Sequence, residues 1–201
     1  YIENNYIVNN IAHRCAVKIP SGIGCLQSLQ KLHKVEANSD ALIAELGRLR
    51  QLRKLHIFNI KAENGIALCT MLEKMINLQS PRISAKSEEK VLEFQSMSSP
   101  PPLLRTLFLY GRLEKLPEWI PKLNFIVKMG LLWSRLMDDP LKVLQTLSNL
   151  TYLRLYDGYE GEQLHIERGG FQNLMFLGLE NLGGLNRLII DKGALPLLES
   201  L

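Results

Sequence analysis

Aromatic and arginine side chains recur along the chain at positions where a strand would turn them toward solvent. Tyr152, Arg154 and Tyr156 alternate with Leu153 and Leu155, so the aromatic and charged side chains share one face and the leucines the other. Aromatic rings together with arginine are the composition of binding hot spots in protein interfaces. We therefore predict a protein-binding surface, and its members are Phe58, Arg82, Phe108, Tyr110, Lys128, Tyr152, Arg154, Tyr156 and Phe176.

Groups suited to catalysis or metal binding do not gather into a site. His56 would have His33 beside it in one of two possible strand registers, and two ligands are too few for a protein metal site. The carboxylate pairs Asp138–Asp139 and Glu88–Glu89 precede or open predicted helices, where negative charge complements the helix dipole. Nucleophilic catalysis needs groups that converge in a cleft, and no pattern brings a cysteine to a histidine. We predict no enzymatic activity, no metal and no cofactor in this chain.

The strand at Tyr152 belongs to a series. A frame with apolar first, fourth and sixth residues returns at intervals of 20 to 26 residues. The fourth residues are Val35, Leu55, Pro81, Leu107, Met129, Leu153 and Leu177, and Leu201 continues the spacing. Leucine-rich repeats, a solenoid with one strand per turn, have this period. Stacked turns would bury the fourth and sixth residues in one continuous core.

The predicted fold is an α/β solenoid: an irregular leucine-rich-repeat horseshoe with a parallel sheet on the concave side and helices or loops on the convex side. About seven repeats would form a single array over 1–201, as a fragment without native caps and with 1–18 as an irregular lead-in. The third, fifth and seventh places of each frame would face solvent, with successive strands about 4.8 Å apart. All nine interface residues occupy these places.

Two features predict departures from a regular solenoid, and the register of the first frame has to be chosen separately. Pro81 removes a ladder hydrogen bond at a core strand place, so we expect a weakened or broken sheet there. The ninth place lacks the Asn or Cys of regular repeats, so we expect no asparagine ladder. In the first frame we take Val35 rather than Leu32 as the fourth residue, because the alternative register would place Lys34 in the core.

Helical periodicity predicts the convex elements. Helices are expected over 40–52, 64–76 and 87–94, and Asp139 with Pro140 is expected to open another at Leu141. The prolines at 100–102 predict an exposed connector, and 188–190 is a candidate extra strand.

Composition and charge narrow the class of protein. No apolar run approaches the length of a transmembrane helix. The net charge of +4 is spread along the chain and does not favour a nucleic-acid partner. Cys15, Cys25 and Cys69 are odd in number and form no Cys-x-x-Cys pair, which predicts buried free thiols in a reducing compartment.

Four phrases carry a more specific resemblance. They are Leu107–Ile120 (LFLYGRLEKLPEWI), Gly130–Leu141 (GLLWSRLMDDPL), Gly169–Leu174 (GGFQNL) and Lys192–Glu199 (KGALPLLE). Their order and spacing resemble the repeat domain of plant coiled-coil-class nucleotide-binding leucine-rich-repeat (NLR) disease-resistance proteins, especially those of cereals, over about 19–201. Pro81 departs from this family, which has an aliphatic residue there.

The resemblance implies an upstream coiled-coil domain and a nucleotide switch domain that binds ADP or ATP. Neither is in this chain, which has no Gly-x-x-x-x-Gly-Lys phosphate loop. In the family the repeat domain restrains the switch domain and senses a pathogen effector, directly or through a guarded host protein. Activation leads to defence and hypersensitive cell death. The resemblance also implies a cytoplasmic protein, or one at the plasma-membrane periphery or in the nucleus when full-length, without membrane contact by this domain.

Two alternatives share the repeat frame. A cytosolic adaptor or ubiquitin-ligase substrate receptor unrelated to immunity would be distinguished by the lack of an upstream nucleotide-binding domain in its gene. An extracellular receptor-kinase ectodomain would need regular Asn-rich repeats with a Gly-x-Ile-Pro turn and paired cysteine caps, and both are missing.

Overall fold

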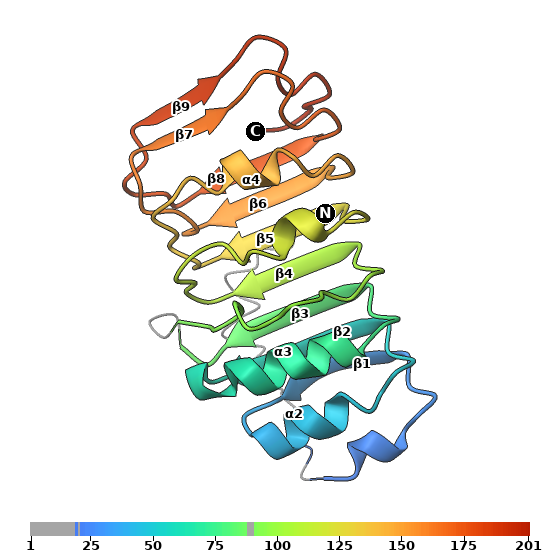
Figure 1. Ribbon diagram of the computed structural model, residues 1–201. Coiled ribbons are helices and arrows are strands. Elements are labelled where there is room, and N and C mark those ends of the chain that lie inside the picture. The colour runs from blue at the N-terminus through green and yellow to red at the C-terminus, as the bar shows by residue number, and fades with distance from the viewer. Residues whose placement is uncertain (1–18, 20, 88–90) are drawn as a thin grey trace.

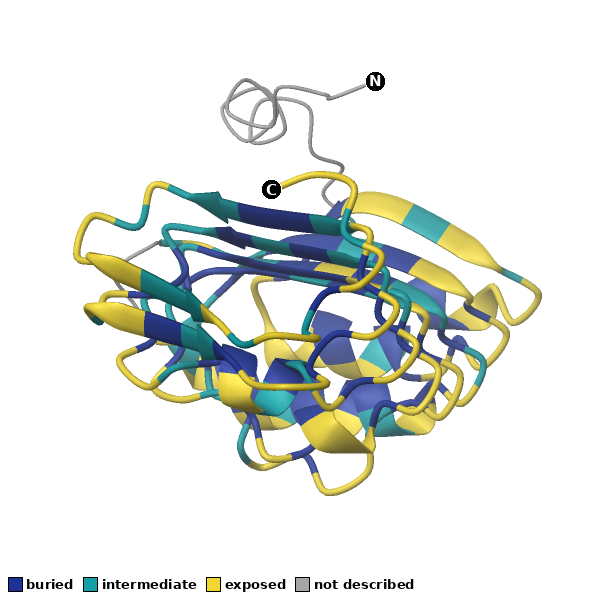
Figure 2. Cartoon of the chain, turned by 90° about the horizontal axis from the view of Figure 1, so that it is seen from above, coloured by how far each residue is buried: buried dark blue, intermediate teal, exposed yellow. Residues whose placement is uncertain are grey.

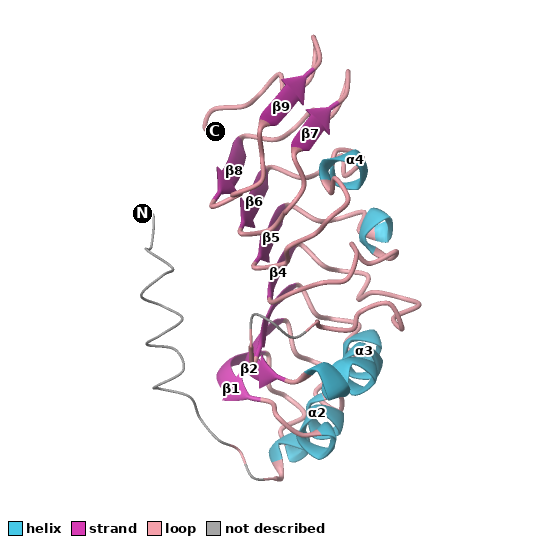
Figure 3. Cartoon of the chain, turned by 90° about the vertical axis from the view of Figure 1, so that its left-hand side faces the viewer, coloured by secondary structure: helices cyan, strands magenta, loops and turns pink. Residues whose placement is uncertain are grey.

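A parallel sheet forms one side of the molecule in the computed structural model, which describes residues 19, 21–87 and 91–201. Its strands lie in chain order: β1 (Lys31–Glu36), β2 (Lys54–Ile60), β3 (Ser80–Ala85), β4 (Thr106–Tyr110), β5 (Lys128–Leu132), β6 (Tyr152–Tyr156) and β8 (Phe176–Glu180). The sheet is the concave side, and helices and loops cover the opposite side (Figures 1 and 3). The predicted solenoid is confirmed, whereas the lead-in over 1–18 lies outside the described residues.

The second half of the sheet keeps the predicted register. Leu107, Met129, Leu153 and Leu177 are successive partners across β4, β5, β6 and β8. Phe176 also bridges Ser200, so the frame continues to the last turn of the chain. Equal strand lengths and an unshifted register bring equivalent places of neighbouring turns side by side.

The first strand has a different register from the predicted one. Leu32 pairs with Leu55 and Val35 with Ile57, with a register shift between them, so the choice of Val35 as the fourth residue was wrong. Lys34 adopts a left-handed backbone with φ 56° within this shift and stays exposed. The bulge thus removes the conflict that argued against Leu32, because the extra residue redirects the lysine toward solvent.

Pro81 does not break the sheet. It pairs with Leu55 on β2, and Ser80 N donates to Arg53 O at 3.0 Å in the preceding turn. Since alternate residues of a strand bond to opposite neighbours, the missing N–H of Pro81 falls on the β4 side. There the ladder begins only at Arg82 and Phe108, so the proline shortens one ladder and leaves the sheet continuous.

Convex elements differ from turn to turn, as predicted for an irregular solenoid. They comprise η1 (Ile23–Cys25), α2 (Asp40–Leu46), η2 (Ala62–Asn64), α3 (Gly65–Lys74), η3 (Ile120–Lys122) and α4 (Leu141–Leu144). Asp139 Oδ1 accepts a hydrogen bond from Leu141 N at 2.8 Å, although Pro140 and not Asp139 is the N-cap residue of α4. The helix expected over 87–94 is wrong for 91–94, which are not helical, and 88–90 lie outside the described residues.

A second, two-stranded parallel sheet flanks the last turns. It pairs β7 (Gln163–Ile166) with β9 (Arg187–Ile190), so the candidate strand at 188–190 is confirmed (Figure 1). Its partner was missed, because the glycines on both sides of 163–166 suggested an irregular excursion.

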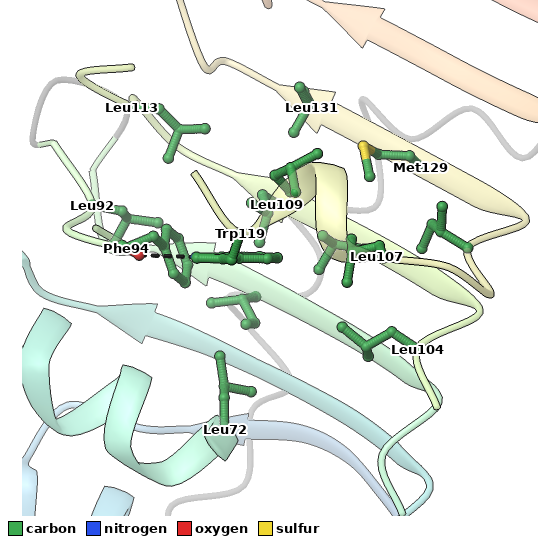
Figure 4. Close-up of a cluster of buried hydrophobic side chains, with 14 of the residues drawn as sticks. Leu72, Leu92, Phe94, Leu104, Leu107, Leu109, Leu113, Trp119, Met129 and Leu131 are labelled. Carbon is green, nitrogen blue, oxygen red and sulfur yellow. Dashed lines mark hydrogen bonds between the residues drawn. The ribbon is translucent and has the colours of Figure 1, made fainter. Parts of the chain in front are cut away.

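The core runs without interruption between the sheet and the convex side. Buried residues form a dark band along the strands, and Leu153, Leu155 and Leu177 are fully buried (Figure 2). Where the convex side lacks a long helix, large side chains fill the space: Trp119 packs near Phe94 and donates from Nε1 to its carbonyl oxygen at 2.9 Å (Figure 4). Each buried leucine or phenylalanine contributes about 1.5–3 kcal/mol relative to exposure.

Three asparagines bond to the preceding turn from a position four residues before the fourth place, but two intervening turns have Leu103 and Phe125 there, so no continuous ladder forms. Asn77, Asn149 and Asn173 each donate from Nδ2 to a backbone carbonyl of the preceding turn, at 2.7–2.9 Å. At the ninth place, buried Ser134 donates from Oγ to Gly158 O at 3.0 Å. The asparagine amides thus satisfy turn carbonyls, whereas the Gly158 carbonyl also accepts from Leu136 N at 3.1 Å.

Burial contradicts two further predictions in part. Cys69 is buried and Cys25 is exposed, so the prediction of buried thiols is wrong for Cys25, which lies in a short surface turn, and Cys15 lies outside the described residues. The proline connector is only partly exposed, because Met97 and Pro101 are buried and Glu73 Oε1 accepts from Ser98 N at 2.7 Å. Among the described residues, no helix has the length and apolarity needed to cross a bilayer.

Candidate protein-interaction surface

Six aromatic rings meet on the concave face of β4–β8, and we call them the aromatic cluster. Tyr152 and Phe176, partners at the third place, stack with 4.5 Å between ring centroids and 6° between planes. The other neighbouring centroids lie 5.7–6.4 Å apart. The cluster comprises Phe108, Tyr110, Trp133, Tyr152, Tyr156 and Phe176. Such ring pairs contribute about 0.5–1.5 kcal/mol beyond their buried area, so the cluster is a pre-formed surface.

Two glycines allow the rings to lie flat on the sheet. A Cβ at Gly130 would lie 2.4 Å from Cδ1 of Phe108, and one at Gly178 would lie 3.0 Å from Cε1 of Phe176. Both glycines occupy the fifth place, where any larger side chain would compete with the ring for the same space. The small residues therefore position the cluster, although they contribute no side chain of their own.

Two arginines frame the cluster, and their environments differ. Arg82 is exposed, and its guanidinium carbon lies 5.1 Å from the ring centroid of Phe108. Arg154 is half-buried, lies 5.8 Å from the Tyr156 centroid and forms a bidentate pair with Glu180, with both N–O distances 2.8 Å. This hydrogen-bonded carboxylate raises the pKa of Arg154. Arg82 is thus available to an incoming carboxylate, whereas Arg154 is already engaged.

Burial keeps the tyrosines of the cluster neutral. It raises the pKa of both Tyr110 and Tyr152 above the usual value for tyrosine, against the opposing effect of nearby arginines. Their hydroxyls therefore remain hydrogen-bond donors at physiological pH, on rings that are otherwise apolar.

Trp133 was not among the predicted interface residues. Its place, the eighth, has a positive φ in most turns and holds Asn59, Gly111, Asp157 and Asn181 elsewhere. Those residue types tolerate this backbone, whereas a tryptophan with φ 56° is strained. Its ring is held between Tyr110 and Tyr156, at 6.1 and 5.7 Å. A bulky residue among Asn, Asp and Gly was the sequence signal for its special role.

Comparison with known proteins identifies the repeat. A family model described as "Leucine-rich repeat region" matches residues 10–201. The chain belongs to the leucine-rich-repeat family.

Several relatives of this repeat region are plant disease-resistance or disease-susceptibility proteins. Disease resistance protein RPM1 of Arabidopsis thaliana is 31% identical over 176 residues, which are 88% of this chain and 19% of RPM1. Disease susceptibility protein LOV1 of the same plant is 29% identical, over 83% of this chain and 16% of LOV1. Disease resistance protein Pik-2 of Oryza sativa subsp. japonica is 30% identical, over 64% of this chain and 13% of Pik-2.

The repeat region is thus homologous to the repeat regions of plant coiled-coil-class NLR disease-resistance proteins, as the four phrases predicted. Proteins of both Arabidopsis and rice match, so the comparison does not distinguish a cereal origin. The chain spans about a fifth, or less, of the length of these relatives.

The structure positions the predicted interface residues of this leucine-rich-repeat region unevenly. Phe108, Tyr152, Arg154, Tyr156 and Phe176 are half-buried in or beside the cluster, and Arg82 and Lys128 are exposed. Two expectations of exposure are wrong. Tyr110 is 9% exposed because Phe108 and Trp133 pack on it. Phe58 is 5% exposed on β2, where the strand shifts register directly after it and in–out alternation fails. It is separated from the cluster by β3.

His56 is positioned by the repeat region's first turns and lies apart from the cluster. Burial, followed by the positive charges of Arg82, His33 and Lys34, lowers its pKa from 6.5 to about 4. A histidine held neutral in this way could bind a metal only with further ligands. In the described part of the chain, no group of three or more His, Cys, Asp or Glu side chains could hold a metal ion.

Proposed function

We propose that this repeat region is the sensing and regulatory module of an intracellular plant immune receptor. It acts as a non-catalytic binding domain in the cytoplasm, restrains the receptor's nucleotide switch domain at rest, and detects a pathogen effector directly or through a guarded host protein. Loss of restraint then leads to defence signalling and hypersensitive cell death. Residues 1–201 serve as one continuous repeat array.

The observation that supports this proposal is the aromatic cluster on β4–β8. Soluble proteins seldom display so many rings on one face unless the face is a binding site. The rings are pre-packed, so little side-chain entropy is lost when a partner covers them. The arginines at their edge supply the orienting polar contacts typical of hot spots.

The experiment replaces Tyr152, Tyr156 and Phe176 together by alanine in the intact receptor. These rings are half-buried, so their loss changes the surface more than the core, in contrast to Tyr110. The matched control is Phe125→Ala, because Phe125 is 55% exposed and lies outside the strands. Receptor abundance is compared by immunoblot, and cell death is scored with and without the effector.

Two outcomes support the proposal: cell death without effector, which means that restraint is lost, or no cell death with effector, which means that sensing is lost. Wild-type behaviour of the triple variant in both conditions, at equal abundance, would reject the cluster as the functional surface. The Phe125→Ala receptor is expected to behave as wild type.

A further inference from the structure

A second, chemically different surface precedes the aromatic cluster on the concave face. Lys31, Lys34, Lys54 and Arg82 on β1–β3 are all exposed, and we call them the basic strip. Lys31 and Lys54 are Cα partners on neighbouring strands, and Arg82 pairs with His56 in the next row. The strip therefore carries positive charge on three consecutive strands, about 4.8 Å apart.

The charges of the strip are not neutralised within the described part of the chain. None of its four cations forms an ion pair there. The three strands carry one carboxylate, Glu36, and its Oε1 accepts hydrogen bonds from the amides of Asn38 and Asn59 at 2.9 and 2.5 Å. Exposed cations on adjacent strands repel one another, so a bound anion would stabilise the face.

The cations of the basic strip contribute to the lowered pKa of His56. This histidine lies on β2 between the cations, and Arg82 and Lys34 both disfavour its protonation, after the larger effect of burial. The bulge at Lys34 thus has a consequence for the surface, because it leaves this lysine exposed and adds a positive charge that acts on His56.

We propose that the basic strip binds an acidic, extended segment of a partner protein, laid across β1–β3 so that its following apolar residue reaches the aromatic cluster. An extended peptide places every second side chain on one face, about 7 Å apart, within reach of flexible lysines. Arg82 marks the junction, because its guanidinium lies over Phe108, the first ring of the cluster. The segment would therefore carry several Asp or Glu residues followed by an aromatic or aliphatic residue.

An acidic peptide fits this face better than a nucleic acid does. Base stacking needs free ring faces, but Tyr152 and Phe176 stack on each other and Arg82 covers Phe108. Glu180, a partly exposed carboxylate beside the cluster, would repel a phosphate backbone. A peptide can end its acidic stretch at Arg82 and continue with apolar residues, which a uniformly charged strand cannot do.

This inference deepens the proposed function by naming a partner chemistry, and its test is independent of cell death. Binding of a fluorescein-labelled peptide, Glu-Gly repeats ending in Phe, is measured by anisotropy with the whole 201-residue chain. Probes for comparison are the Lys-Gly analogue and single-stranded oligouridine. The variants are Lys54→Glu/Arg82→Glu and the neutral Lys54→Gln/Arg82→Gln. The matched control is Lys142→Glu, an exposed lysine on convex α4.

We expect the acidic peptide to bind and its affinity to fall about tenfold in the double Glu variant, as for reversal of two screened surface charges. The affinity of the Gln variant for the peptide should lie between those of wild type and the double Glu variant, and the affinity of Lys142→Glu should match wild type. Peptide binding should raise the pKa of His56, followed by NMR, because carboxylates offset the cations around it. Equal affinity of the double Glu variant, or tighter binding of oligouridine than of the peptide, would overturn the inference. Wild-type behaviour of the triple aromatic variant in cells would instead count against the proposed role of the aromatic cluster.

Discussion

The two halves of the concave face are built from the same repeat but differ in regularity and chemistry. In β4, β5, β6 and β8 every strand has five residues and the register is unshifted, so equivalent rings stack from turn to turn. In β1–β3 the register shifts twice, at 32–35 and at 57–60, and four of the exposed side chains are cations. A regular register lets rings of neighbouring turns pack on one another, whereas the shifted register of β1–β3 accompanies a face of exposed cations.

The convex side follows the same division. Behind β1–β3 lie the helices α2 and α3, whereas behind β4–β8 the turns contain η3, the single helical turn α4 and the flanking sheet β7–β9 (Figure 3). Each repeat must fill the same interior volume, and different elements do so. The concave register is therefore set by the strand leucines and not by the type of convex element.

The largest expected effect tests whether the regular half is the more tightly specified one. Leu153→Ala removes a fully buried side chain in the middle of the unshifted register, and we expect a loss of about 2–5 kcal/mol in the free energy of unfolding. Leu32→Ala, at the bulged strand where the leucine is half-buried, should cost about 1 kcal/mol. Urea denaturation measures both, and equal losses would remove the distinction between the halves.

A smaller effect is expected when a side chain fills the space that the two glycines leave for the rings. Gly130→Ala places a Cβ 2.4 Å from the Phe108 ring, so the ring must move and we expect a loss of about 1–3 kcal/mol. Gly178→Ala, with its nearest contact at 3.0 Å, is the milder control. Thermal unfolding gives the stability, and tryptophan fluorescence reports the change around Trp133. A Gly130→Ala protein with wild-type stability and spectrum would mean that the rings do not depend on the glycine.

The charged half should respond to pH where the aromatic half does not. Because the folded-state pKa of His56 lies near 4, below the unfolded value of 6.5, the unfolded chain binds more protons between these values. The contribution of His56 is therefore lost as pH falls from about 6.5 to about 4, by roughly 1 kcal/mol after solvent screening. His56→Gln should abolish this part of the pH dependence. In wild type, an NMR titration midpoint near 6.5 for His56 would contradict the described environment.

The smallest effect concerns the shortened ladder between the halves. Pro81→Val restores an N–H that can bond toward β4, worth about 0.5–1.5 kcal/mol, but it also frees the unfolded chain, which offsets about 0.4–1 kcal/mol. We therefore expect a net change within about 1 kcal/mol and slower hydrogen exchange of amides in β4. Unchanged exchange in β4 would show that the proline does not limit the ladder.

The sequence predicted most where its frame was regular. The leucines of β4, β5, β6 and β8 predicted the strands and their register correctly, since periodicity and strand alternation are local properties. The register of β1 was predicted wrongly because Lys34 lies in a bulge, and a bulge depends on how the strand pairs with its neighbour. Phe58 is buried where the register of β2 shifts, and Tyr110 is buried partly by Trp133 from the next turn. The Arg154–Glu180 pair and the strained Trp133 likewise required the stacking of turns before they could be recognised.

The central claim, that the aromatic cluster is a partner-contacting surface, is tested most directly by hydroxyl-radical footprinting of the intact receptor. Oxidation of Tyr152, Tyr156 and Phe176 is measured by mass spectrometry in the 201-residue chain, in the resting receptor and after effector treatment, with exposed Phe125 as internal reference. We predict protection of the three rings in the resting or the effector-treated receptor relative to the isolated chain. Equal oxidation of these rings in all three samples would contradict the claim.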